Sequence, residues 1–198
     1  QRGNRRQQTF FDAADYARYV DLIAEGCSNA GVQVLAWCLM PNHVHLILVP
    51  QTADGLVKAL RLAHQRYTWV VNRRNGWKGY LWQGRFYSCP LDDAHLGFAV
   101  RYVELNPQRA RLVAEPGQGR WSSARGRIDG CGDRLVGPAR APALREIGDW
   151  RTFLALGIAE EQLARIRKHT ASGTTWGHTL PRGVPDYPRP GDTHSGMS

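Results

Sequence analysis

Apolar and polar residues recur along the first half of the chain at the spacings of helices and strands. Helical spacing marks three segments, at residues 12–30, 56–74 and 93–106. Apolar runs of strand length occupy three more, at residues 32–40, 43–49 and 81–88. Asp12 and Asp92 precede helical segments as capping residues, and Pro41-Asn42 forms a turn between the first two strands. We therefore expect those two strands to form an antiparallel hairpin.

The order of these elements, helix-strand-strand-helix-strand-helix, predicts an α+β fold. One more strand before Gln1 would complete the ferredoxin-like split-βαβ pattern, an antiparallel sheet with helices on one face. That strand would be central, between the strand at residues 81–88 and the strand at residues 43–49. We interpret the chain as lacking its first strand. We expect a protein that starts at Gln1 to fold poorly, because its sheet would have a gap.

Changes in composition divide the chain into three parts. Residues 1–115 hold the elements described above and form the main domain. Residues 116–170 are rich in Gly, Arg and Pro and regain a helical pattern at residues 150–168, which predicts a C-terminal helical extension. Residues 171–198 are rich in Gly, Pro and Thr, and we expect them to form a disordered tail.

The net charge of the chain indicates what kind of partner the protein binds. Lys and Arg number 26 against 17 Asp and Glu, a formal net charge of +9, which favours a polyanionic partner such as nucleic acid. The apolar fraction of 42% excludes a mainly disordered chain. No apolar run approaches the roughly 20 residues that span a membrane. The four cysteines lack paired metal-ligand spacing and no secretory leader is visible, so a reducing cytoplasm is favoured.

Two short motifs carry candidate chemistry. His43 and His45 are two residues apart in a strand, so both point to one face and make half of a divalent-metal site. Tyr102 and Asn106 lie one helical turn apart, so a tyrosine nucleophile and an amide metal ligand would be neighbours. Taken alone, a His-x-His pair is more often surface and a helical tyrosine more often core. The two motifs are informative only together.

Together, the motifs resemble those of a known enzyme family. Pro41-Asn42 followed by His43-Val44-His45 resembles the His-hydrophobe-His signature of the HUH endonucleases. The segment from Tyr102 to Pro107 resembles the tyrosine helix of single-tyrosine transposases. Further segments are similar to the REP-associated tyrosine transposases: Arg2-Gly3-Asn4, LWQGRFYS at residues 81–88, and Trp121 to Ser123. The resemblance covers residues 2–170 and departs from the family after Thr170.

The resemblance implies a function for the main domain, residues 1–115, as an HUH catalytic domain. Mg²⁺ or Mn²⁺ would be held by His43, His45 and Asn106, and Tyr102 would attack single-stranded DNA to give a 5′-phosphotyrosine. Strands would then be rejoined at hairpin-forming palindromic repeats, in a bacterial cytoplasm close to the nucleoid. Whether such a protein is a monomer or a homodimer stays open.

Basic and polar residues in local clusters are predicted to contact DNA. They are Arg2, Asn4, Arg5, Arg6, Arg66, Arg73, Arg74, Lys78, Arg85, Arg109 and Arg111. Trp77, Tyr80 and Trp82 are predicted to stack on unpaired bases. Two other functions stay open. The chain could be a domesticated protein that binds hairpin DNA or RNA without cutting, or a metal-dependent RNA-processing nuclease that does not need Tyr102.

Overall fold

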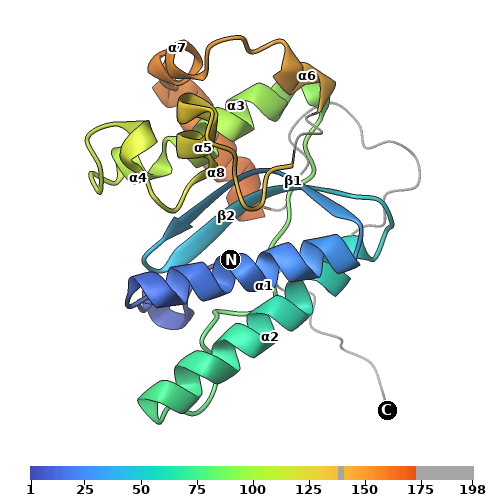
Figure 1. Cartoon of the computed structure of the whole chain (residues 1–198), viewed down its shortest axis with the longest axis vertical. Coiled ribbons are helices and arrows are strands. Elements are labelled where there is room, and N and C mark those ends of the chain that lie inside the picture. Colours follow the sequence, from blue (N-terminus) through green and yellow to red (C-terminus); the bar gives the residue numbers. More distant parts are fainter. Residues whose placement is uncertain (138–140, 173–198) are drawn as a thin grey trace.

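The computed structural model describes residues 1–137 and 141–172, and it arranges them around a two-stranded antiparallel sheet (Figure 1). The elements in chain order are η1 (Asn4–Arg6), α1 (Ala13–Asn29), β1 (Val32–Met40), β2 (His43–Pro50), α2 (Gly55–Asn75), α3 (Asp93–Glu104), α4 (Asn106–Arg109), η2 (Pro116–Gln118), α5 (Ser123–Asp129), α6 (Pro142–Arg145), α7 (Trp150–Ala155) and α8 (Glu160–Ser172). The predicted α+β class, the hairpin and the helical C-terminal part are confirmed.

The sheet is covered by helices on both faces, and the prediction of helices on one face was wrong. In β1, Trp37 and Leu39 face the core formed with α1 and α2. Cys38 and Met40 face the opposite way, into a core formed with α3. A strand whose residues are apolar on both sides needs a helical layer on each side to exclude water. Figure 1 shows α1 and α2 on one side of the hairpin and α3 on the other.

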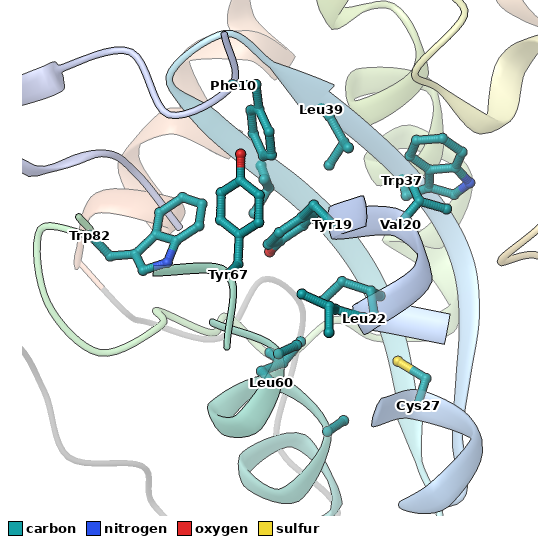
Figure 2. Packing of buried hydrophobic residues seen from close by; sticks show 14 of the residues in the cluster. Phe10, Tyr19, Val20, Leu22, Cys27, Trp37, Leu39, Leu60, Tyr67 and Trp82 are labelled. Carbon is teal, nitrogen blue, oxygen red and sulfur yellow. The ribbon is translucent and has the colours of Figure 1, made fainter. Parts of the chain in front are cut away.

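Aromatic side chains dominate the core between the sheet and the α1–α2 pair. Figure 2 shows Phe10, Tyr19, Tyr67 and Trp82 packed together beside the hairpin. The two helices approach closely at Gly26, where a Cβ atom would lie 2.3 Å from the backbone oxygen of Ala59. This close contact leaves no room for a side chain at that crossing.

Residues 81–88 do not form the predicted third strand. Trp82 makes a single bridge to Gly3, and the Gln83 amide donates to the Arg2 carbonyl at 2.9 Å. The opposite side of the same N-terminal segment pairs with the start of β2, since the Val44 amide donates to the Gln1 carbonyl at 2.8 Å. Gln1 to Gly3 thus hold the central position that the fold assigns to the first strand. Because Gln1 to Gly3 form so short a segment, residues 81–88 make backbone contacts with it only near Trp82 and Gln83.

The part after residue 115 packs against the sheet. The Leu39 amide donates to the Trp121 carbonyl at 2.9 Å, so residues 121–122 cover the outer edge of β1. Leu144 and Trp150 are buried in the core that contains α3. The described residues between 116 and 170 therefore add to the layer over the α3 face. The predicted tail lies outside the described residues from residue 173 onward. Within the described ranges, no helix has the length and apolar character needed to cross a membrane.

Candidate active site

The two histidines project from one face of β2, as the sequence predicted, and the structure turns that face toward α3. His43 pairs with Met40 of β1 and His45 with Cys38, and both of those partners face the core that contains α3. Val44, between the histidines, is 4% exposed in the opposite core. The His43 and His45 rings are 4.9 Å apart between centroids and nearly perpendicular. A rigid strand therefore presents two imidazoles side by side.

Tyr102 comes to this pair from α3. Its ring meets the His45 ring edge to face, with centroids 5.7 Å apart. Asp92 begins the helix as predicted, because its carboxylate accepts from the His95 amide at 3.0 Å. Tyr102 is only partly buried. The fold thus brings the predicted nucleophile on α3 to the predicted ligand His45 on β2, 57 positions earlier in the chain.

Asn106 is adjacent to Tyr102, although it does not belong to the same helix. The α3 helix ends at Glu104, and Asn106 begins the short helix α4. Pro107 has no amide hydrogen to donate to the preceding turn, which explains why the predicted single helix breaks here. The Asn106 Nδ2 atom donates to the Tyr102 carbonyl at 2.9 Å, and the residue is 9% exposed. This bond uses the amide nitrogen and not the Oδ1 atom, whose oxygen chemistry suits a divalent metal.

The donor set fits a metal held by two histidines and an amide oxygen. His43 Nδ1 lies 2.7 Å from Asn42 Oδ1, an outer contact that orients the ring and leaves Nε2 for coordination. Burial, aided by the charges of Arg2 and the amino terminus, lowers the pKa of His43 to about 4. Burial and the adjacent His43 also lower the pKa of His45. Both rings are neutral at neutral pH, as metal ligation requires. No group of three or more His, Cys, Asp or Glu forms a metal cluster among the described residues, so an amide or substrate oxygen would complete the set.

Arg109 lies against Tyr102. Its guanidinium carbon is 4.9 Å from the centroid of the Tyr102 ring. Its Nη1 atom is buried without a hydrogen-bond partner among the residues that the structure describes. A buried guanidinium nitrogen normally has an acceptor, so this atom is suited to receive a ligand oxygen. Sequence reasoning grouped Arg109 with general DNA contacts, whereas the fold places it beside Tyr102.

A buried acidic residue behind Tyr102 escaped the sequence reading. Glu104 is fully buried at the end of α3. Its Oε1 accepts from the Ser123 hydroxyl at 2.6 Å and lies 3.4 Å from Arg127 Nε. The Trp37 amide donates to the same Ser123 hydroxyl at 3.1 Å, which connects the cluster to β1. The Glu104 cluster therefore anchors the tyrosine helix to the sheet. Its sequence signal was a Glu in an apolar helix together with the Trp-Ser-Ser segment, which the resemblance noted without assigning a role.

The N-terminal basic residues lie next to the histidines. The backbone of Arg2 forms an isolated antiparallel β-bridge with the backbone of His43. The Arg6 carbonyl accepts a hydrogen bond from Asn42 Nδ2 at 3.1 Å. The Arg5 and Arg6 backbones both have positive φ values, 50° and 61°, and their side chains are exposed. Such conformations are costly for residues other than glycine. Asn4 is held in the same loop by its amide, which donates to the Leu81 carbonyl at 2.8 Å.

Some of the remaining residues predicted to contact DNA form ion pairs within the protein, and the others have exposed side chains. Arg66 binds Glu25 at 2.7 Å, and Arg74 binds Asp15 at 2.7 Å, so both connect α2 to α1. The open side chains are Arg73, Lys78, Arg85 and Arg111.

Two tryptophans differ in exposure from what the sequence suggested. Trp82 is 6% exposed and packs against Tyr19 and Tyr67, so the prediction that it stacks on bases was wrong. Sequence reasoning missed Trp69, which is 61% exposed. Its position between the buried residues Tyr67 and Val71 was the available signal.

Comparisons with known proteins agree with this geometry. Residues 2–106, more than half of the chain, match the family model described as "Transposase IS200 like". A solved structure of a REP-associated tyrosine transposase bound to a REP hairpin has a similar fold. It shares 19% identity with a TM-score of 0.52, over 70% of this chain and 81% of that one. None of the curated proteins matches the chain. On the strength of the family match, which contains the histidine pair, Tyr102 and Asn106, the chain belongs to the IS200-like transposase family.

Proposed function

We propose that this protein is a metal-dependent enzyme that nicks and rejoins single-stranded DNA at hairpin-forming repeats. The observation that carries the proposal is the contact between Tyr102 and His45, with His43 beside them. The proposed nucleophile and the proposed pair of metal ligands come from separate segments and lie side by side, each partly buried. The REP hairpin bound to the structurally similar transposase supports hairpin DNA as the substrate.

Tyr102 performs the covalent step in this proposal. Its hydroxyl oxygen attacks the phosphorus, the bond from phosphorus to the 3′ oxygen breaks, and a 5′-phosphotyrosine forms. The phenol proton passes to solvent, and the departing 3′ oxygen takes a proton from solvent. Attack by another 3′-hydroxyl on the phosphotyrosine reverses the step and joins strands without an external energy source.

The neighbouring side chains bind and orient the phosphate. His43, His45 and Asn106 Oδ1 would hold Mg²⁺ or Mn²⁺, which when bound supplies Lewis-acid polarisation of the phosphoryl oxygens. Arg109 Nη1 donates to a non-bridging phosphoryl oxygen, and the same guanidinium packs on the Tyr102 ring. Arg2, Arg5 and Arg6 contact phosphates close to the histidines.

The test is a covalent-adduct assay with labelled hairpin DNA carrying single-stranded flanks, in the presence of Mn²⁺. Wild type is expected to give a slow-migrating protein–DNA band, and Tyr102→Phe is expected to give none. Tyr80→Phe is the matched control, because Tyr80 is 85% exposed in the loop after α2. Cleavage that survives in Tyr102→Phe would contradict the proposal and favour a nuclease that does not use a tyrosine. Hairpin binding without any adduct would favour a non-catalytic binding protein.

A further inference from the structure

Large aromatic side chains are exposed around the C-terminal end of α2. Tyr67 and Val71 point into the core, which turns Trp69 outward, where it is 61% exposed. Trp77 and Tyr80 follow the helix and are 44% and 85% exposed. Most large aromatic residues that the structure describes are buried or half-buried, so the concentration of exposed ones here indicates a surface that binds something.

Each side of this helix end carries an arginine next to an aromatic ring. The Arg73 guanidinium carbon lies 5.3 Å from the Trp69 ring centroid. Arg74 lies 5.6 Å from the Phe11 ring, which in turn meets Trp77 edge to face at 5.8 Å. These contacts restrict the aromatic rings and place positive charge at their edges.

The positive charge at this surface is only partly neutralised. Residues 55–80 contain Lys or Arg at six positions and no Asp or Glu. Carboxylates of α1 and its N-cap pair with Arg66 and Arg74. Across the described ranges, neither Arg73 nor Lys78 forms an ion pair. Positive charge therefore remains beside Trp69 and after the helix, where a polyanion would be bound.

An exposed tryptophan beside an unpaired arginine fits single-stranded nucleic acid best. A base can stack on the indole while its phosphate contacts the guanidinium, and every base has a face for this contact. In a duplex the base faces are covered by neighbouring pairs, so a hairpin stem could use the arginine but not the tryptophan.

We propose that the C-terminal end of α2 is a second binding surface for single-stranded nucleic acid, separate from the Tyr102 site. Trp69 stacks on an unpaired base, and Arg73 and Lys78 contact the adjoining phosphates. Figure 1 shows α2 and α3 on opposite sides of the hairpin, so this surface does not belong to the face where Tyr102 lies. With the proposed function as its basis, the surface holds the strand that flanks the hairpin.

The direct test measures binding of the full chain to labelled oligothymidylate of about 15 nucleotides, a length that spans one site. Trp69→Ala is expected to weaken binding about five- to hundredfold, the usual range for loss of one stacked base. Arg73→Gln is expected to reduce the slope of log affinity against log salt by about 0.7. Leu62→Ala is the matched control, because Leu62 is 51% exposed on the same helix and offers neither stacking nor charge. All three side chains are exposed, so melting temperatures should stay unchanged.

The outcomes separate this inference from the proposed function. Equal binding of oligothymidylate by wild type and Trp69→Ala, or no binding by wild type, would overturn the inference. So would an equal loss of affinity for a blunt hairpin that has no single-stranded flank. If Trp69→Ala loses oligothymidylate while wild type forms no covalent adduct with any hairpin, the inference stands and the proposed function fails.

Discussion

Among the residues that the structure describes, one tyrosine–histidine pair lies on each side of the sheet, and the surroundings of the two pairs differ. In the core beside α1 and α2, the Tyr19 hydroxyl lies 2.8 Å from His64 Nε2, and Tyr19 is fully buried. On the α3 side, the rings of Tyr102 and His45 meet edge to face at 5.7 Å and are partly buried. The same two residue types are thus enclosed in one place and accessible in the other.

The difference shows that surroundings, and not residue type, assign the chemistry. Burial raises the pKa of the Tyr19 phenol and lowers the pKa of His64 to about 3, so both stay neutral near pH 7. Their hydrogen bond satisfies two buried polar groups and contributes to stability. Tyr102 instead has the Arg109 cation on its ring and is only partly buried. A tyrosine can act on a substrate only where the substrate can reach it.

Removing one hydroxyl from each pair should separate the two roles most strongly. Tyr102→Phe is expected to reduce adduct formation by more than about a thousandfold with no loss of stability. Tyr19→Phe is expected to keep the adduct and lower the free energy of unfolding by about 1–3 kcal/mol, because His64 loses its partner. Adduct yield and urea unfolding measure the two effects. A folded Tyr19→Phe protein without adduct would contradict the structural role of the buried pair.

On the α3 side of the sheet, the buried cluster around Glu104 should contribute more to the free energy of unfolding than exposed ion pairs do. Glu104→Ala is expected to cost about 3–5 kcal/mol in unfolding free energy, because Arg127 is left buried without its carboxylate. Asp129→Ala is the control. It breaks an exposed pair with Arg125 at 3.7 Å and should change stability by no more than about 1 kcal/mol. Equal effects of the two substitutions would show that the buried pair does not anchor the tyrosine helix.

Arg109 is the feature that most clearly separates the Tyr102 pair from the buried pair. Arg109→Gln is expected to slow adduct formation at saturating DNA by about 10²–10³-fold, the range for removing one donor to developing charge. Arg111→Gln, two residues later and exposed, should have little effect on that rate. Single-turnover kinetics and DNA affinity should be measured together. A loss confined to affinity would show that Arg109 only binds DNA.

The buried pair should make the protein sensitive to acid. His64 is neutral in the folded state, with a pKa of about 3, whereas an unfolded histidine has a pKa near 6.5. Because the folded pKa is lowered, this contribution to stability is complete above about pH 6.5 and is lost as the pH falls toward 3. The free energy of unfolding lost through His64 between pH 7 and pH 5 is ~2 kcal/mol.

The matched variant for the acid effect is His64→Gln, which can still bond to Tyr19. His43 and His45 also have lowered pKa values, so the variant should keep part of the acid sensitivity. Urea unfolding at pH 7 and pH 5 should show a smaller loss in His64→Gln than in wild type. Identical losses would mean that His64 is not the group that takes up the proton.

Local pattern was sufficient for the elements and for the chemistry of single segments. The helix that begins after Asp12, the turn at Pro41-Asn42 and the common face of His43 and His45 depend on residues within a few positions of each other. Helical spacing placed Tyr102 beside Asn106, and the resemblance implied the catalytic role of that pair. The same pattern failed at residues 81–88, because a strand also needs a partner along its length, and that partner comes from elsewhere in the chain.

By itself, the sequence determined the α+β order, the histidine face and the identity of Tyr102 and Asn106 as candidates. Only the tertiary structure decided that His45 meets Tyr102, that Arg109 covers the same ring, and that Glu104 anchors the helix. It also decided that Trp82 is buried and Trp69 exposed. The physical reason is range. Periodicity records neighbours within one or two turns, whereas burial, ion pairing and ring contacts depend on segments that folding brings together from distant positions.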